Sequence, residues 1–405
     1  MRRCFKIIIV ALILIASKFW SLSRSQCQFN EKVHQELWTT TSLSGFEPIT
    51  KPEQPLIILF TTFKDDSEST HHRLAHKIVT KNWASFGLSF IKPVLFTNST
   101  LTPKFYNLTA AIVANHNEPL FEASLSEIAF FYGWDLLPIP AVNIHGTPFL
   151  KPMFKKIFQT YNATFYGFAS GDLLFDQSLI DSLIFIKRYL QHPLDNNVLL
   201  VGRRTDVSLY SNNTVLPLQQ HQQQQTKTAE ATITTGKTNT PKKIRKTKTP
   251  TKASEPVSLT PEIFQKFAEH FDKPNLAKLA KTGELRYIDA IDYFIYTRDG
   301  SRYNWTALAD VVIGRAAYDN YLLAMANMMG CTSVDLTNTV VCVHLSKPGV
   351  SNTGFQNVDH HFNYRSIGQF DWRKGHTNVT HYYTENDNEG KPSKLTSRYE
   401  GGREV

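Results

Sequence analysis

Cysteine is scarce in this sequence, with four residues among 405. No two of them are spaced as the close ligand pairs that structural zinc sites use, so a zinc centre is not expected. Cys331 and Cys342 can pair in an oxidising compartment, while Cys4 and Cys27 flank the N-terminal apolar run. With 41% hydrophobic residues, the chain can bury one large core or two smaller ones.

A long apolar run is also missing. Eleven residues separate Lys6 from Lys18, which is about 17 Å of helix against a bilayer core of about 30 Å. If Lys18 snorkels and residues 19–22 are counted, residues 1–25 can form a type II signal-anchor with its positive end in the cytosol. The Ser-Leu-Ser triplet at residues 21–23 is also an acceptable cleavage site, which would give a secreted protein.

Either outcome places the rest of the chain in the secretory lumen, with residues 26–54 as a stem. Sequons of the form Asn-x-Ser/Thr agree with this placement and predict a glycoprotein. There are six of them, at Asn98, Asn107, Asn162, Asn212, Asn304 and Asn378.

Broad positive charge is lacking too, although the net charge is +9. Between Lys227 and Lys252 there are eight Lys or Arg and one acid, Glu230, so this segment alone carries +7. The remainder is close to neutral, which argues against a nucleic-acid partner. Residues 217–257 are too polar to build a core and predict a disordered basic and Gln-rich insertion in a surface loop. Residues 385–405 are expected to be a disordered tail.

What the sequence does contain is an alternation of apolar runs with helical periodicity. This alternation predicts an α/β fold with a mostly parallel central sheet flanked by helices. Strands are expected at residues 55–60, 90–96, 110–114, 165–172, 198–201, 287–298 and 335–345. Helices are expected at residues 74–86, 150–158, 179–186, 258–281 and 321–329, with Pro148 in the first turn of the second.

The stretch at residues 165–176 is the centre of the functional argument. Asp172 follows a buried strand, at the position where open α/β sheets hold ligands. Gly171 has no side chain, so a phosphate or a metal ion can come close. Asp176 is a plausible N-cap for the next helix. The alternative is that Asp172 only caps a turn.

Other polar side chains are candidates for the same site. Thr61 and Lys64 follow the first strand, and Lys151 lies off the apolar face of its helix, where a solvated lysine is the alternative. Arg203 and Arg204 follow another strand, where they either clamp a diphosphate or pair with acids at the sheet edge.

Two later residues complete the candidate set. Asp319 lies near a helix start, where it can act as a base, a cap or both. His344 shares one face of its strand with Val340 and Cys342, and either has a functional role or is a core histidine.

The order of these features resembles the GT-A-type, nucleotide-sugar-dependent glycosyltransferases of the Golgi, which have a Rossmann-like fold. The resemblance covers roughly residues 55–384 outside the insertion. It is carried by HGTPFLK (145–151), FYGFASGDLLFD (165–176), VGRRTD (201–206), IDYFI (291–295), IGRAAYDNYL (313–322) and VCVHL (341–345). It implies a nucleotide-sugar-binding half at residues 55–216 and an acceptor half at residues 258–384.

The resemblance also implies roles for individual residues. Asp172 and His344 would hold a divalent ion, Mn²⁺ or Mg²⁺, at the diphosphate of the donor, and Asp319 would deprotonate the acceptor. Gly171 and the residues Thr61, Lys64, Lys151, Arg203 and Arg204 would contact the donor. Ser170 replaces the first acid of the usual Asp-x-Asp metal motif, which implies weaker metal binding or a transferase that has lost activity.

The expected function is therefore transfer of a sugar from a nucleotide-diphosphate donor to a glycan or glycoprotein acceptor, by an enzyme anchored in the Golgi membrane. The alternative is a catalytically inactive lumenal protein on the same fold that binds a glycan or a partner. A metal-dependent phosphoester hydrolase ranks last, because a denser cluster of acids or histidines is missing.

Overall fold

The computed structural model describes residues 54–63, 70–98, 123–190, 194, 196–208, 273–297, 304–346 and 357–399. The expected anchor and stem, Lys64, the strand at residues 110–114 and the insertion at residues 217–257 lie outside these ranges. Residues from Gln54 onward belong to one compact unit. Within the described ranges, no helix has the length and apolar character needed to cross a membrane.

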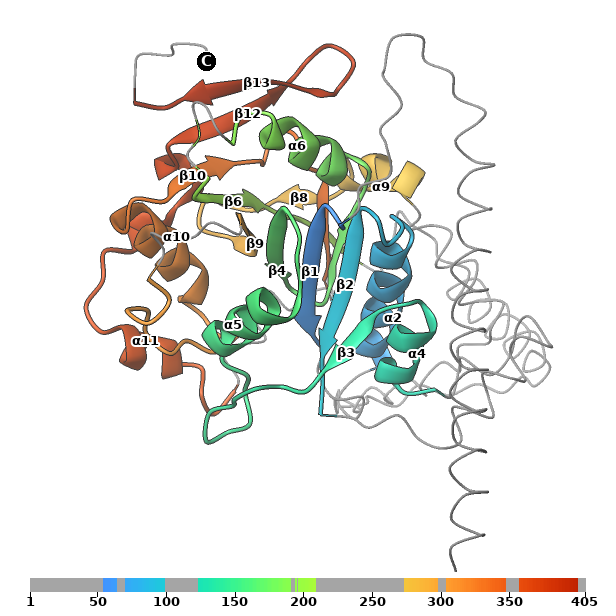
Figure 1. The fold of residues 1–405 in the computed structure, drawn as a ribbon, viewed down its shortest axis with the longest axis vertical. Helices are drawn as coiled ribbons and strands as arrows, with labels where there is room; N and C mark the ends of the chain where they lie inside the picture. Colours follow the sequence, from blue (N-terminus) through green and yellow to red (C-terminus); the bar gives the residue numbers. More distant parts are fainter. Residues whose placement is uncertain are drawn as a thin grey trace, which may run out of the picture. The chain divides into compact units, whose positions relative to one another are not determined.

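A nine-stranded mixed sheet forms the centre of the fold (Figure 1). Its order is β13-β12-β10-β6-β9-β4-β1-β2-β3, and β9 runs antiparallel to both of its neighbours. Most other pairs are parallel, so the expectation of a largely parallel sheet holds except at β9 and the β12–β13 hairpin. In sequence order the strands are β1 (Ile57–Thr62), β2 (Ile91–Phe96), β3 (Asp135–Leu137), β4 (Phe165–Ala169), β6 (Val198–Arg203), β9 (Ile291–Thr297), β10 (Thr332–Asp335), β12 (Tyr382–Asn386) and β13 (Pro392–Ser397).

A second, four-stranded sheet packs in the same unit. Its order is β5-β11-β7-β8, with β11 antiparallel to β5 and parallel to β7. The strands are β5 (Leu173–Phe175), β7 (Thr205–Ser208), β8 (Glu284–Leu285) and β11 (Cys342–Ser346). β5, β7 and β11 each follow a strand of the central sheet in the chain, and β8 directly precedes β9, so four direct connections join the two sheets.

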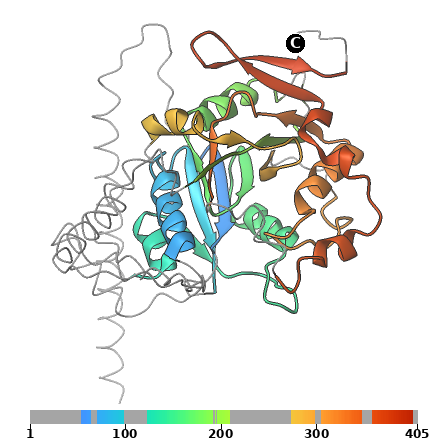
Figure 2. The same cartoon turned by 180° about the vertical axis from the view of Figure 1, so that it is seen from behind.

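Helices cover both faces of the central sheet (Figures 1 and 2). One apolar cluster joins α2 (Thr70–Ala84), α6 (Ser178–Lys187) and α9 (Lys273–Ala280) to one face and to the small sheet. The other joins α5 (Leu150–Thr160) and α10 (Tyr318–Met328) to the opposite face. The remaining elements are α4 (Leu125–Phe131), α11 (Phe362–Ile367), η4 (Trp372–Gly375) and η5 (Thr377–Val379).

The continuous apolar run of β1 explains its central place. Successive side chains of a strand point to opposite faces. Accordingly, Ile57 and Leu59 lie in the first cluster, whereas Ile58 and Phe60 lie in the second, and all four are at most 1% exposed. A strand that is apolar on both faces can only be accommodated between two layers of helices.

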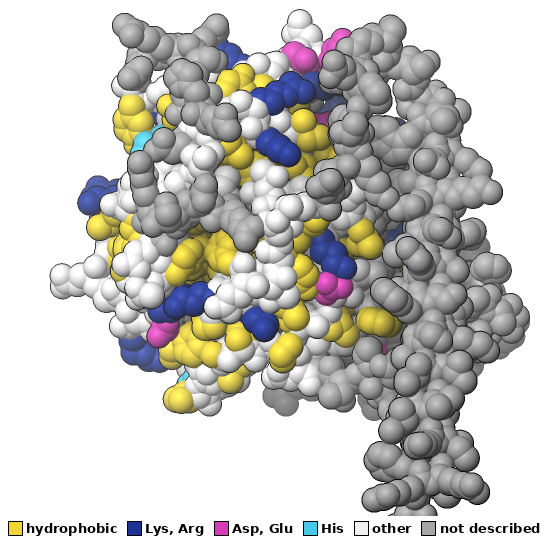
Figure 3. Space-filling view, viewed as in Figure 1, with side chains coloured by type: hydrophobic (Ala, Val, Ile, Leu, Met, Phe, Trp, Pro, Cys, Tyr) yellow, Lys and Arg dark blue, Asp and Glu magenta, His cyan; other side chains and the backbone are white. Residues whose placement is uncertain are grey.

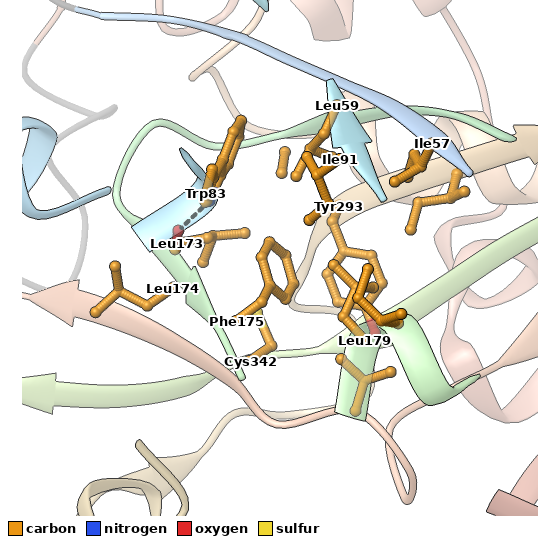
Figure 4. Packing of buried hydrophobic residues seen from close by; sticks show 14 of the residues in the cluster. Ile57, Leu59, Trp83, Ile91, Leu173, Leu174, Phe175, Leu179, Tyr293 and Cys342 are labelled. Carbon is orange, nitrogen blue, oxygen red and sulfur yellow. Dashed lines mark hydrogen bonds between the residues drawn. The ribbon is translucent and has the colours of Figure 1, made fainter. Parts of the chain in front are cut away.

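The first cluster also fixes the strand that follows the candidate acid. The indole Nε1 of Trp83 donates to the carbonyl of Leu173 over 3.0 Å, which Figure 4 marks with a dashed line. The side chain of Asn82 both donates to and accepts from the backbone of Phe175, each over 3.0 Å. The polar atoms of α2 thereby satisfy the free edge of β5 and hold it in register.

Three local expectations need correction. Pro148 is not in the first turn of α5: it forms an isolated bridge with Val142, and the first turn holds Pro152 instead. Asp176 is one residue before the N-cap position of α6, although its carboxylate still accepts a hydrogen bond from Ser178 N over 2.9 Å. Residues 335–345 are two strands, because the chain turns at residues 337–339 and enters the small sheet.

The expected disordered tail is also wrong over most of its length. Residues 385–399 belong to the β12–β13 hairpin and its exit, with a turn at Gly390 that has a φ of 77°. Leu395 is fully buried and attaches the hairpin to the core. Cys331 and Cys342 are both buried and no disulfide joins them, so the pairing considered from the sequence does not form.

The described surface bears on two further expectations. Asn98, Asn162, Asn304 and Asn378 are all exposed, as glycan acceptors must be, while Asn107 and Asn212 lie outside the described residues. On the face shown in Figure 3, the described Lys and Arg side chains form small separate groups. That face therefore carries no continuous basic surface.

Candidate active site

The strand order of the central sheet reverses beside β1. From β1 the chain builds β2 and β3 on one side, whereas β4, β6, β10 and β12 follow on the other. β1 and β4 are parallel neighbours, with Ile57 opposite Phe165, so both strands end at the same edge. Open α/β sheets bind ligands outside the carboxyl ends of strands at such a reversal. The residues that follow Thr62 and Ala169 therefore lie where the topology favours a site.

Several connections between the central sheet and the small sheet lie at this edge, and two of them hold candidate residues. Residues 170–172 connect β4 to β5, and Arg204 alone connects β6 to β7. The carbonyl of Asp172 accepts a hydrogen bond from Leu345 N of β11 over 3.0 Å. The turn with Asp172 is thus tied to β11, and Arg204 is brought to the same edge.

His344 lies between two carboxylates. Its Nδ1 is 3.0 Å from Oδ1 of Asp206, and its Nε2 is 3.1 Å from Oδ2 of Asp172. His344 and Asp206 are directly paired residues of β11 and β7, and such pairs project to the same face of a sheet. Asp172 reaches the other side of the ring from its turn. We refer to Asp206, His344 and Asp172 together as the carboxylate–histidine chain.

The charges of Asp206, His344 and Asp172 stabilise one another. Burial lowers the pKa of His344, but Asp172 and Asp206 outweigh burial and raise that pKa above its ordinary value. Burial raises the pKa of Asp172, but His344, His76 and Arg204 hold it well below its ordinary value. The pKa of Asp206 is also lowered, because His344 and Arg204 outweigh the effect of burial. Two ionised acceptors are best satisfied by two N–H donors, so this arrangement favours the doubly protonated form of the imidazole ring.

Arg204 is the positive group that balances the acids of the edge. Its Nε donates to Oδ1 of Asp206 over 2.8 Å, and its Nη1 pairs with Asp292 of β9. The sequence left two roles open for Arg203 and Arg204, which were to clamp a diphosphate or to pair with acids at the sheet edge. Arg204 has the second of these roles. Arg203 donates from Nη1 to the carbonyl of Arg286 over 3.3 Å. A diphosphate at Arg204 would have to compete with two carboxylates.

Asp319 lies in the first turn of α10, at the same edge. Burial raises the pKa of Asp319 to about 7, although Arg204 acts in the opposite direction. The preceding residue, Tyr318, is 5% exposed and hydrogen-bonds with the side chain of Ser170. Burial and then Asp319 raise the pKa of Tyr318, and Asp172 adds to this effect. A carboxyl group that can exchange a proton near neutral pH therefore lies close to the carboxylate–histidine chain.

Gly171 has a different role from the expected one. A Cβ atom at this position would lie 2.9 Å from the ring of Phe63 and 2.9 Å from the carbonyl of Thr62. The missing side chain therefore makes room for the end of β1, and that space is not open to a phosphate or a metal ion. On the other side of the turn, Nδ1 of His76 is 2.8 Å from the carbonyl of Gly171.

The remaining donor-site candidates are engaged elsewhere or not described. Thr61 is 1% exposed, and its hydroxyl donates to a backbone carbonyl of β1. Lys151 donates to the carbonyl of Leu308 over 2.8 Å and pairs with Asp310, so its charge holds the loop before α10. Lys64 lies outside the described residues.

Asp172 and His344, the expected metal ligands, are in direct contact. Oδ1 of Asp172 is buried and has no hydrogen-bond partner among the described residues. Asp206 holds Nδ1 of His344, which is how a carboxylate commonly orients a metal-binding histidine. These two features fit a divalent ion. Across the described ranges, no group of three or more His, Cys, Asp or Glu side chains is arranged to hold one, so further ligands would come from substrate and water.

Sequence reasoning assigned no role to several side chains that complete this edge. They are His76, Asp206, Asp292 and Tyr318. Asp206 and His344 are on strands that pair only in the folded chain, and no local pattern shows that pairing.

Comparison with known proteins adds no family. No model of a known protein family matches this chain, and no curated protein matches its sequence.

Proposed function

We propose that this chain is a glycosyltransferase with a GT-A-type fold, which moves a sugar from a nucleotide-diphosphate donor to a glycan or glycoprotein acceptor. The observation that carries the proposal is the contact between Asp172 and His344 at the reversal of strand order. The mixed α/β sheet with helices on both faces supports a Rossmann-like nucleotide-binding fold. The carboxyl group of Asp319 nearby, with its raised pKa, supports a reaction that includes a proton transfer.

The carboxylate–histidine chain is the donor end of the proposed site. Asp172 and His344 would hold a divalent ion, Mn²⁺ or Mg²⁺, whose charge stabilises the diphosphate leaving group. Asp206 keeps the ring of His344 in one orientation through Nδ1. His344 must release its Nε2 proton before that nitrogen can act as a ligand, so donor binding is coupled to pH.

Asp319 is the acceptor end. The oxygen of the acceptor hydroxyl would form a bond to the anomeric carbon of the donor sugar, while the bond from that carbon to the diphosphate breaks. The hydroxyl proton passes to the carboxylate of Asp319. A pKa of about 7 suits this task, because a base works best when its pKa is near the working pH.

The location we propose is the lumenal side of the Golgi membrane, with residues 1–25 as the anchor. Exposure of the four described sequon asparagines supports a lumenal, glycosylated protein. Cleavage after the apolar run would give a secreted form of the same enzyme.

The test is a donor panel with the full chain purified from a secretory host. Nucleotide sugars are supplied with Mn²⁺, and release of the nucleotide diphosphate is measured. We expect release with one donor class and its loss in Asp172→Ala. The control is Asp371→Ala, which removes an exposed acid whose ion-pair partner among the described residues is Arg373. No release from any donor, together with no nucleotide binding by calorimetry, contradicts the proposal.

A non-enzymatic glycan-binding or partner-binding protein is the second candidate. It is favoured by the closed state of the site, in which both ring nitrogens of His344 already face carboxylates. It predicts that Asp172→Ala leaves glycan or partner binding unchanged and that nucleotides do not bind.

A further inference from the structure

The chain enters α10 through a backbone conformation that an ordinary residue rarely adopts. Ala317 has a φ of 83° and is the one non-glycine residue with positive φ in the described part of the chain. A Cβ atom in this left-handed region lies too close to the neighbouring carbonyl oxygen. Such a conformation persists only where the surrounding structure enforces it. Asp319 follows two residues later.

Asn363 of α11 enforces the turn before Ala317 from one side. Its side chain is fully buried and makes four hydrogen bonds to that turn. Oδ1 accepts from Val312 N over 2.8 Å. Nδ2 donates to the carbonyls of Val312, Ala316 and Arg315 over 2.9, 3.2 and 3.3 Å. All of these partners are backbone atoms, so Asn363 fixes the path of the chain rather than the position of a side chain.

Asp359 holds the same turn through a side chain. It is fully buried, pairs with Nε of Arg315 and accepts hydrogen bonds from Thr147 Oγ1 over 2.6 Å and Asn143 Nδ2 over 2.9 Å. Asp359 therefore joins the turn at residues 312–317 to the loop at residues 143–147. That loop leads directly into α5.

The backbone that follows Asp319 is also held in place. Nδ2 of Asn320 donates to the carbonyls of Gly375 and Asp289, each over 3.1 Å. Gly375 is packed so closely on the backbone of Asn320 that no Cβ atom fits there. The backbone is thus held immediately before and immediately after Asp319.

We propose that Asn363 and Asp359 are positioning residues for Asp319. They hold residues 312–317 so that α10 begins at Tyr318 and the carboxyl group of Asp319 keeps its place in the first turn of that helix. The charged and titratable groups that face Asp319 are Arg204, Asp289 and Tyr318. The inference rests on the proposed function only for the role of Asp319 as a base. The placement of Asp319 is tested by a measurement that needs no enzymatic activity.

The decisive measurement is the pKa of Asp319, read from its carboxyl carbon by NMR in the full chain and assigned with Asp319→Asn. Asn363→Ala should lower that pKa by about one unit or more, because water reaches a carboxyl group that is no longer held in place. The matched control is Asn327→Ala at the other end of α10, where Nδ2 makes one bond, to Val379 over 3.4 Å. It should leave the pKa unchanged.

A second substitution separates positioning from mere stabilisation. Ala317→Gly, added to Asn363→Ala, removes the conflict at the left-handed residue and should raise the melting temperature. It should not restore the pKa of Asp319, because glycine at position 317 does not replace the hydrogen bonds that the side chain of Asn363 made. If Asn363→Ala does not fold, Asp359→Asn takes its place, since it keeps the shape of the side chain.

Two results overturn the inference. One is an unchanged pKa of Asp319 in a destabilised Asn363→Ala protein. The other is recovery of melting temperature and pKa together on adding Ala317→Gly. If the wild-type chain neither cleaves any donor nor binds nucleotide, the proposed function is overturned instead, and the NMR result on Asp319 does not depend on that outcome.

Discussion

Asp172 and His344 are 172 residues apart in the sequence, yet Oδ2 of the first lies 3.1 Å from Nε2 of the second. The turn after β4 and the register of β11 bring them together, and Asp206 secures the histidine from its other side. Their protonation states are therefore linked, so a change at one should be measurable at the other.

The first prediction concerns that linkage. Asp172→Asn should lower the pKa of His344 by about one unit, because one of two carboxylates that oppose the effect of burial is lost. The titration of its Cε1 proton by NMR measures this change. Asp371→Asn, which removes the acid at the N-cap position of η4, is the control. An identical midpoint in wild type and Asp172→Asn would show that the two groups are independent.

The second prediction concerns Asp319 and stability. Its pKa is raised from 3.8 to about 7 by burial, so between these values the folded state holds a proton that the unfolded state lacks. The free energy of unfolding therefore falls as pH rises through this range. Asp319→Asn removes the effect, and its melting temperature should exceed that of wild type by a few degrees at about pH 8 but not at about pH 4. Equal gains at both pH values argue against a titrating Asp319.

The third prediction concerns Asp359 and acid unfolding. Burial raises its pKa, but hydrogen bonds from Thr147, Asn143 and Arg315 prevail and hold it at about 2. A lowered pKa stabilises the fold above the unfolded value near 3.8, and the stabilisation is lost as pH falls through about 2. Asp359→Asn should cost roughly 2 kcal/mol in urea unfolding at neutral pH. The cost should shrink towards pH 2, and a constant cost would point to packing alone.

The fourth prediction concerns the exit of β6. A Cβ atom at Gly202 would overlap the hydroxyl of Tyr293 and lie 3.3 Å from Thr337 N. Gly202→Ala should therefore destabilise the protein by about 1–3 kcal/mol. The Tyr293 hydroxyl is buried without a hydrogen-bond partner among the described residues. Tyr293→Phe alone should be close to neutral and should partly rescue Gly202→Ala in a double-mutant cycle.

Much of the fold is predictable from local patterns. The run at residues 55–60 is apolar at every position, which indicates a strand covered on both faces, and β1 is such a strand. Leu150, Met153 and Ile157 recur at helical spacing and form the buried face of α5. The position of Asp172 after β4 follows from the same kind of reasoning.

Pairing between distant segments is what the sequence does not reveal. The sequence around Asp206 does not indicate that β7 pairs with β11, so the contact between Asp206 and His344 was not predicted. The prediction of a tail from residue 385 onward missed the end of β12 and all of β13, in which only Leu395 and Thr396 have buried side chains. The space beside Gly171 looked open because the approach of Phe63 depends on the turn geometry.

The antiparallel strand β9 has a consequence for how the protein is made. It lies between β4 and β6, but it comes after more than 80 further residues of chain beyond β6. While the ribosome is still translating that stretch, the inner edges of β4 and β6 have no partner and expose backbone groups able to pair with other chains. A nascent chain stalled before residue 291 should therefore bind chaperones or aggregate, whereas one that has released residue 297 can close its sheet.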